Sequence, residues 1–397
     1  MRSVLESRVH QSAFEPVFDV FWSTSTRRAL TASLVAAAAV VFVFKASSEM
    51  RDFEVYWTAG ARAARAEPLY RVEDGHFVFK YLPAFAVLAV PAGLLPLSAA
   101  KAFWFVFSVL LIVALFSLSI EVLPEKRKPV WTLRVVLLIV LGKFLGHELI
   151  LGQVNILMAT AAAAALLAMK STREPLAGAL IVFAIVLKPY AVLLLPWLLA
   201  RRRRGSILAA FAGFFLVLIG PSALYGWSGS LAQHHAWWET VTTTTAPNLF
   251  VADNVSLVSA FSRILGPGEA AGWWAAASSV LLLALAGVIF LFRRHVRCPE
   301  GLEGALLLTL MPLLSPQGWD YVFLLSAPAV AYLANYEDRL PRAVRVLAIA
   351  ALAAIGLSLF DVMGRSAYRA FMEASMITWL YIVVVAALAA LRLRKVA

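Results

Sequence analysis

Acidic and aromatic residues alternate in the stretch Asp52-Phe53-Glu54-Val55-Tyr56, shortly after the first long apolar block. A carboxylate held against aromatic rings has a raised pKa, which suits it to take a proton from a hydroxyl group. An acid at the start of a helix also caps free backbone N–H groups. Two interpretations of Asp52 therefore fit the sequence, a catalytic base or a helix cap.

Other polar residues that could bind a phosphate or a sugar lie mostly in short turns between apolar blocks. They are Tyr56, Tyr81, His147, Glu148, Gln153, Asn155, Lys188, Asn254, Trp319, Asp320 and Tyr321. A lysine among apolar residues, such as Lys188, either needs an anionic partner or extends its ammonium group to the membrane surface. Gln153 and Asn155 fit sugar hydroxyls or turn capping equally well. Trp319 fits a stacked sugar or an interfacial aromatic belt.

Motifs for metal or nucleotide binding are absent from the sequence. It contains no HExxH, no CxxC and no glycine loop followed by Lys-Ser or Lys-Thr. The single cysteine, Cys298, leaves no partner for a disulfide within the chain. The adjacent pair His234-His235 would point apart on a helix, which disfavours a shared metal ion. We expect neither a metal ion nor a cofactor.

Long apolar blocks dominate the composition, and they must position these polar residues. Of 397 residues, 62% are hydrophobic and only 15% are charged, whereas about 25% are charged in an average soluble domain. Blocks of a length that crosses a bilayer include 30–44, 103–120, 151–169 and 275–292. Lipid offers no partner to free backbone groups, so these blocks should be helical. The sequence predicts an all-α integral membrane protein.

Basic residues cluster at the ends of the apolar blocks, for example at Lys126–Lys128 and Arg201–Arg204. This distribution is typical of cytoplasmic loops in the plasma (inner) membrane and not of a nucleic-acid groove, despite the net charge of +12. Placing every cluster on the cytoplasmic side and counting the apolar blocks between the clusters predicts about 12 crossings with both termini cytoplasmic. Residues 1–397 then form one membrane domain, and no nucleic acid is expected as a partner.

Two breaks and two loops complete the predicted topology. Block 81–97 contains three prolines and is expected to be a re-entrant or broken segment, and Lys188-Pro189 should interrupt a second block. The segments 46–80 and 221–270 are expected to be extracytoplasmic loops with helical parts. Nearly all uncompensated polar residues fall on this predicted outer face, which should be the working face.

Several short motifs occur in an order that resembles glycosyltransferase family 87. They are Asp52-Phe53-Glu54-Val55-Tyr56, Ala59-Gly60, Pro68-Leu69-Tyr70, Phe79-Lys80-Tyr81-Leu82-Pro83, Gly152-Gln153-Val154-Asn155, Ala177-Gly178, Lys188-Pro189, Asn254-Val255-Ser256 and Leu314-Ser315-Pro316-Gln317-Gly318-Trp319-Asp320. Each motif alone is weak, but together they span residues 50–330. The sequence departs from the family pattern at Tyr321, where a histidine is usual, and at Leu82, where a second proline is usual.

The resemblance implies a GT-C-type helical bundle that transfers a sugar, in several members mannose, from a polyprenyl monophosphate to an acceptor hydroxyl. It implies that Asp52 is the general base and that the sugar carbon is inverted. Lys188 is expected at the donor phosphate with His147 and Tyr321. Tyr56, Tyr81, Gln153, Asn155, Asn254, Trp319 and Asp320 are expected at the sugar or acceptor. The implied partners are the lipid-linked donor, a glycolipid or glycan acceptor, and membrane lipids.

A transporter and a membrane assembly subunit are the two alternatives to a transferase. A multi-pass transporter or lipid flippase would contain internal repeats and paired acids within its helices, and the sequence has neither in obvious form. A membrane assembly subunit without activity would not collect polar residues on one face. The sequence therefore favours an enzyme.

Overall fold

A computed structural model gives the fold of residues 33, 39–244, 248–249, 251–292 and 298–394. The chain divides into two compact units, Met1–Glu49 and Met50–Ala397. In the smaller unit the described helices are a π-helix, Phe42–Ala46, and α3, Ser47–Glu49. Most of the predicted first membrane block, 30–44, lies outside the described residues. In the larger unit every regular element among the described residues is helical.

The larger unit begins with two helices that pack face to face, α4 (Arg51–Ala64) and α5 (Pro83–Gly93). Between them in the chain lies the short 3-10 helix η2 (Val72–Phe77). The close approach of α4 and α5 depends on Gly60, because a Cβ atom there would lie 2.3 Å from the carbonyl oxygen of Ala89. Pro83 occupies the first turn of α5, where its missing N–H costs nothing.

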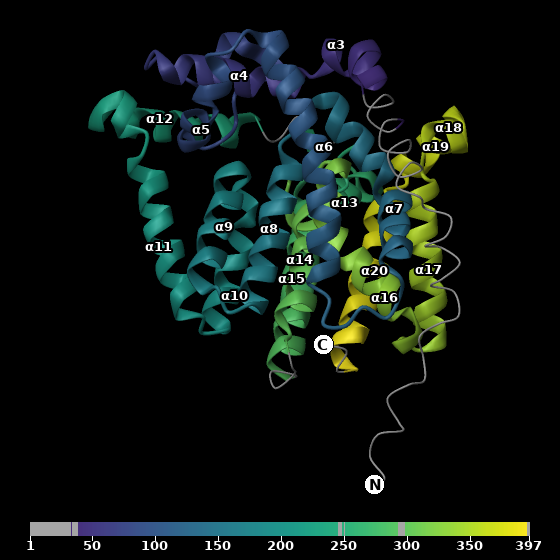
Figure 1. The fold of residues 1–397 in the computed structure, drawn as a ribbon. Helices are drawn as coiled ribbons and strands as arrows, with labels where there is room; N and C mark the ends of the chain where they lie inside the picture. The colour runs from purple at the N-terminus through teal and green to yellow at the C-terminus, as the bar shows by residue number, and fades with distance from the viewer. Residues whose placement is uncertain (1–32, 34–38, 245–247, 250, 293–297, 395–397) are drawn as a thin grey trace. The chain divides into compact units, whose positions relative to one another are not determined.

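Most of the following helices stand beside one another, whereas α12 runs across the end of α11 (Figure 1), and several contact their neighbours in chain order. They are α6 (Leu97–Glu121), α7 (Val130–Leu151), α8 (Asn155–Lys170), α9 (Glu174–Leu187), η3 (Pro189–Leu193), α10 (Leu194–Ala200), α11 (Arg204–Ile219) and α12 (Ser222–Thr244). Helix α8 packs between α6 and α9, and α9 packs against α11. The interruption predicted at Lys188-Pro189 is confirmed, because α9 ends at Leu187 and η3 begins at Pro189.

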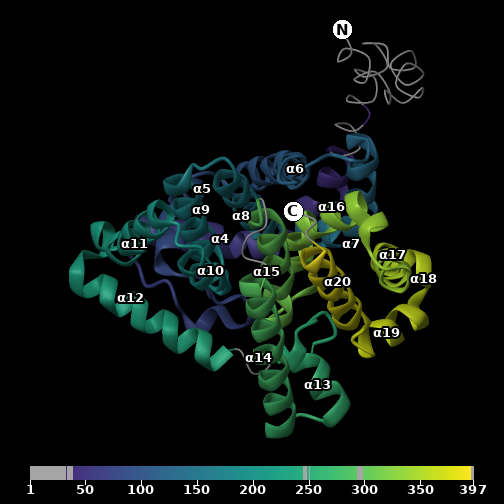
Figure 2. The ribbon, with the colours of Figure 1, turned by 90° about the horizontal axis from the view of Figure 1, so that it is seen from below.

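The last part of the chain adds further helices to the same unit. They are α13 (Leu257–Leu265), α14 (Glu269–Phe292), α15 (Glu300–Leu314), η5 (Asp320–Ser326), α16 (Ala327–Tyr336), η6 (Glu337–Arg339), α17 (Arg342–Leu357), α18 (Phe360–Met363), α19 (Arg365–Glu373) and α20 (Met376–Leu393). Figure 2 shows α15 beside both α8 and α20, and each pair is in contact. Helix α15 is buried along nearly its whole length, so it forms the centre of the core.

Three described helices are long and apolar enough to cross a membrane, namely α6, α14 as far as Leu291, and α20. A fourth candidate is the pair α11 and α12, which are bent by 82° at their junction. Only 11% of the apolar window of α14 is buried. Apolar side chains that face outward over a whole helix are expected in lipid and costly in water. These helices indicate a membrane protein.

The predicted number of about 12 crossings stays a prediction. Several other helices, such as α5 and α8, are apolar but shorter than the roughly 20 residues that cross a bilayer as a helix. Helix α7 is long enough, yet it contains Arg134, Lys143 and Glu148. The segments predicted as outer loops, 46–80 and 221–270, are largely helical, since they contain α4, α12 and α13.

Candidate functional site

Asp52 lies in the first turn of α4, where the helix dipole favours an acid. Its side chain is directed to a partner far away in the sequence. The amide nitrogen Nε2 of Gln153 donates a hydrogen bond of 2.5 Å to Oδ2 of Asp52. Met50 is the N-cap residue of α4, and no side-chain capping bond is formed there. Asp52 is therefore not the cap that one interpretation of the sequence proposed.

The turn between α7 and α8 brings Gln153 to Asp52. Helix α7 ends at Gly152, whose φ of 67° lies in the left-handed region that glycine adopts without strain. A Cβ atom at Gly152 would lie 2.7 Å from Cβ of Phe53 and 3.0 Å from Cε of Met50. Glycine at this position thus lets the turn close onto α4, and Gln153 follows directly.

Gln153 connects the carboxylate to a group of tyrosines. Its Oε1 accepts hydrogen bonds from the hydroxyl of Tyr56 at 2.9 Å and from Nδ2 of Asn155 at 3.2 Å. Its Nε2 also lies 3.4 Å from the hydroxyl of Tyr321. The hydroxyls of Tyr56 and Tyr81 lie 2.7 Å apart. Burial raises the pKa of Tyr56 well above its ordinary value, so its hydroxyl stays protonated.

Lys188 occupies the break between α9 and η3 and extends toward the same tyrosines. Its ammonium group donates a hydrogen bond of 3.0 Å to the hydroxyl of Tyr81 and lies 4.7 Å from the centre of that ring. No carboxylate forms an ion pair with Lys188 among the residues that the structure describes. The break in the helix leaves the ammonium group available to an anion.

Burial raises the pKa of Asp52 above its ordinary value. The hydrogen bond from Gln153 and the charges of Lys188, His76 and Lys80 act in the opposite direction and limit this rise. A half-buried carboxylate with a raised pKa, beside cationic groups, can accept a proton from an incoming hydroxyl. The arrangement therefore combines a proton acceptor with positive charge for a phosphate.

The carboxyl group of Glu148 is buried and forms hydrogen bonds that hold the turn between α7 and α8. It accepts hydrogen bonds from Nδ2 of Asn155 at 3.1 Å and from the backbone N–H of Ile156 at 2.6 Å. Burial raises the pKa of Glu148 to about 7, although both hydrogen bonds lower it. Tyr190 approaches Asn155 from the other side, with its hydroxyl 3.4 Å from Oδ1. Asn155 is thus fixed by three neighbours.

Asp320 lies at the start of η5 and is fully buried between His147 and Lys143. His147 Nδ1 is 3.1 Å from its Oδ1, and Lys143 Nζ is 2.9 Å from its Oδ2. Burial favours a higher pKa of Asp320, but the hydrogen bond with His147 and the charge of Lys143 outweigh it and lower the pKa. The same hydrogen bond raises the pKa of His147. The hydrogen bond with Asp320 thus positions His147. The rings of His147 and Tyr321 make an edge-to-face contact at 6.5 Å between their centres.

The predicted site residues fall into three groups in the structure. One hydrogen-bonded network contains Asp52, Tyr56, Tyr81, Gln153, Asn155, Lys188 and Tyr321. His147, Trp319 and Asp320 adjoin this network around Tyr321, on which the Trp319 ring stacks at 6.4 Å. The backbone of Asn254 pairs with Trp319 in an antiparallel bridge, but its side chain does not enter this network. Its Nδ2 bonds the backbone oxygens of residues 248 and 316, so its side chain holds two loops together.

Two basic residues near the site, Lys80 and His76, are not among the site residues predicted from the sequence. Their charges act on the pKa of Asp52, and burial together with Lys188 lowers the pKa of Lys80. Lys80 lies within the motif Phe79-Lys80-Tyr81, so a signal was present. No group of three His, Cys, Asp or Glu side chains that could hold a metal ion occurs in the described part of the chain.

The comparison with protein families decides the class of the protein. A model of glycosyltransferase family 87 matches residues 79–316, which is more than half of the chain. The chain belongs to glycosyltransferase family 87. It is therefore an enzyme that uses a sugar donor and an acceptor, and the transporter alternative is set aside. No curated protein matches the chain.

The family match and the polar network overlap only in part. The matched segment of this family 87 transferase contains Tyr81, Gln153, Asn155 and Lys188 but starts after Asp52. Asp52 nevertheless forms a direct hydrogen bond with Gln153, a matched residue. Tyr321 also lies outside the matched segment and contacts the same side chain. The network thus joins matched and unmatched parts of the chain.

Proposed function

We propose that this transferase moves a hexosyl unit, in particular mannose, from a polyprenyl monophosphate carrier to a hydroxyl group of a glycolipid or glycan. The reaction takes place at the extracytoplasmic face of the plasma membrane. The observation that carries the proposal is the position of Asp52, which bonds Gln153 within the network that leads through Tyr56 and Tyr81 to Lys188.

In the proposed reaction Asp52 takes the proton of the acceptor hydroxyl. The acceptor oxygen then attacks the anomeric carbon of the sugar, and the bond between that carbon and the phosphate oxygen breaks. The polyprenyl phosphate leaves with the electron pair of this bond, and Lys188 stabilises its negative charge. Phosphate is a good leaving group, so no general acid is required. A single attack from the side opposite the phosphate inverts the anomeric carbon.

Gln153 acts as a positioning residue in this mechanism. Its amide group donates to Asp52 and accepts from Tyr56 and Asn155, so its orientation is fixed by neighbours on both sides. The hydrogen bond to Asp52 also stabilises the ionised form of the carboxylate, which is the form that accepts a proton. Tyr321 lies 3.4 Å from Gln153 and His147 lies beside Tyr321, and we expect both at the remaining oxygens of the phosphate.

The direct test supplies the full-length protein in lipid nanodiscs with polyprenyl-phosphate mannose and membrane lipids. We expect a mannosylated product whose new linkage is inverted relative to the donor, as read by NMR. Asp52→Asn keeps the shape of the side chain but removes the base, so turnover should fall by about 100-fold or more. Asp361→Asn, an exposed acid in α18, should leave turnover unchanged. Full turnover in Asp52→Asn would exclude Asp52 as the base.

A further inference from the structure

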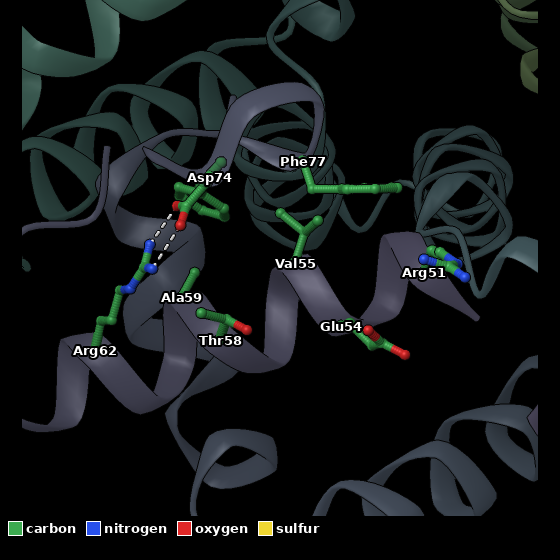
Figure 3. A pocket seen from close by; sticks show the side chains of 9 residues that line it. Arg51, Glu54, Val55, Thr58, Ala59, Arg62, Asp74 and Phe77 are labelled. Atoms are coloured by element: carbon green, nitrogen blue, oxygen red, sulfur yellow. Dashed lines mark hydrogen bonds and ion pairs between the residues drawn. The ribbon is translucent and has the colours of Figure 1, made fainter. Parts of the chain in front are cut away.

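A cavity of about 170 Å³ lies on the side of α4 that faces η2 and the following residues. It is lined by Arg51, Glu54, Val55, Thr58, Ala59, Arg62, Asp74, Phe77 and Phe79. Figure 3 shows Arg51 and Arg62 at opposite ends of this groove, with Thr58 between them. Residues 51 and 62 are about 16 Å apart along a helix axis with a rise of 1.5 Å per residue. The cavity is thus an elongated groove.

The polar groups of the groove are mostly fixed before any ligand binds. Arg62 forms a two-pronged ion pair with Asp74, with contacts of 2.5 and 2.7 Å, as drawn in Figure 3. Glu54 accepts a hydrogen bond of 2.7 Å from Lys101. Fixed donors and acceptors lose little entropy when they bind a ligand, so they favour recognition of a defined polar group.

Arg51 is the exception at the end of the groove next to Asp52. Its guanidinium forms no hydrogen bond or ion pair with any residue in the described part of the structure. Arg51 precedes the proposed base directly in the sequence. A ligand at this end of the groove lies at the level of Asp52 along α4, although the two side chains leave the helix about 100° apart.

The lining of the groove has the chemistry of a sugar site. Planar guanidinium and carboxylate groups match pairs of neighbouring hydroxyls, and Thr58 adds a hydroxyl of its own. The exposed Phe77 supplies aromatic surface for the apolar face of a sugar ring. The cavity volume of about 170 Å³ is well above the ~10–15 Å³ that one water molecule needs, so a small polar ligand fits.

Phe79 separates the groove from the network around Lys188. It lines the groove, and its ring also packs at 5.5 Å between ring centres against Tyr81, the residue that Lys188 contacts. Two substrates must reach Asp52 in a transfer reaction. The Lys188 side carries a free positive charge next to the network that contains Asp52, whereas the charges of the groove are mostly paired, with Arg51 as the exception.

We propose that the groove between α4 and residues 74–79 binds the saccharide head of the acceptor. Assigning the bound saccharide to the acceptor rests on the proposed transfer reaction, but saccharide binding itself requires no turnover. The donor phosphate binds on the far side of Phe79, at Lys188. Asp52 lies where the two substrates meet.

The test measures binding of mannobiose to the full-length protein in lipid nanodiscs by saturation-transfer NMR, without a donor. We expect transfer to mannobiose in the parent protein. Thr58→Trp fills the groove and should abolish the signal, and Arg51→Ala should weaken binding about tenfold without altering the core. Thr243→Trp adds the same bulk on the exposed side of α12 and should leave the signal intact. Lys188→Met should also leave it intact.

The possible outcomes separate this proposal from the transfer reaction. No saturation transfer in the parent protein, or an undiminished signal in both Thr58→Trp and Arg51→Ala, overturns the groove as a saccharide site. A signal lost in Lys188→Met but kept in Arg51→Ala places the saccharide on the donor side and also overturns it. Saccharide binding lost in Arg51→Ala supports the proposal even where polyprenyl-phosphate mannose gives no product. In that case the proposed transfer reaction is wrong, but the groove is still a saccharide site.

Discussion

The ammonium group of Lys188 contacts Tyr81 in two ways. It donates a hydrogen bond to the tyrosine hydroxyl and lies over the face of the ring, and neither contact neutralises the charge of the lysine. Replacing Lys188 by methionine keeps the length of the side chain but removes the charge-assisted hydrogen bond to a phosphate. We expect the KM for polyprenyl-phosphate mannose to rise about tenfold or more, because such bonds contribute about 1.5–3 kcal/mol. Steady-state kinetics with varied donor at saturating acceptor measures this change.

A surface lysine provides the matched control for this variant. Lys128 pairs with Glu337 at 2.7 Å, and its charge is exposed to solvent. Lys128→Met should leave the donor KM unchanged. If Lys188→Met also left the donor KM unchanged, the phosphate would have to bind elsewhere.

Glu148 makes the stability of the protein depend on pH. Its pKa of about 7 in the folded chain is higher than its ordinary value of 4.5. The folded state therefore binds more protons than the unfolded state between these values, and stability is lost as the pH rises from about 5 through about 7. We expect the melting temperature in detergent to fall over this range.

The variant Glu148→Gln cannot titrate, so it should show a flatter profile between pH 5 and 7 than the parent protein. His147 changes the stability of the protein at higher pH, because the pKa of its imidazole is raised above 6.5. Asp320 changes the stability at lower pH, because its pKa is lowered from 3.8. Equal slopes in the parent protein and in Glu148→Gln would show that another group titrates in this range.

At the scale of elements, the α7–α8 turn determines whether Gln153 reaches Asp52. Gly152→Ala forces a side chain into the left-handed region, which costs about 1–2 kcal/mol, and places its Cβ atom against Phe53. We expect a lower melting temperature and a reduced kcat, because Gln153 is displaced from the carboxylate. Thermal unfolding and turnover of the same preparation measure both effects.

A second glycine of α7 serves as the control. Gly142 is helical and has no atom within 4 Å of a Cβ atom built there. Gly142→Ala should therefore be neutral or slightly stabilising, since alanine favours the helix by about 1 kcal/mol. An effect on kcat as large as that of Gly152→Ala would mean that the turn itself is not the cause.

At the scale of the whole molecule, a buried ion cluster joins helices that are far apart in the sequence. Glu303 of α15 accepts hydrogen bonds from Arg392 at 2.8 and 3.0 Å, from Arg201 at 2.8 Å and from Trp197 at 3.0 Å. Glu303 and Arg392 are both fully buried. The cluster connects α15, α20 and the end of α10.

Glu303→Ala should destabilise the molecule strongly, because it leaves two arginines without their shared anion. The loss of a partner from a buried pair costs about 3–5 kcal/mol. Chemical or thermal unfolding in detergent measures the loss. Glu67→Ala removes surface ion pairs with Arg65 and Arg71 and should cost about 0–1 kcal/mol for each pair. Similar losses in the two variants would mean that the cluster is not part of the stable core.

The sequence alone predicted the features that depend on local composition. Uncharged apolar blocks predicted helices and a membrane protein, because the helical period and the bilayer thickness constrain residue type directly. Lys188-Pro189 predicted a helix break, because proline has no N–H to donate. The polar residues between apolar blocks indicated short turns, and Gln153 and Trp319 do lie between helices in the structure. The short motifs also identified the family correctly.

Only the tertiary structure decided which of these residues meet. Asp52 and Gln153 are separated by 101 positions in the chain, and no local pattern states that they form a hydrogen bond. The side chain of Asn254 instead bonds backbone oxygens. The groove on α4 also requires η2 to fold back onto the helix. Contacts of this kind depend on how the helices pack together, so the sequence supplied the candidates and the packing selected among them.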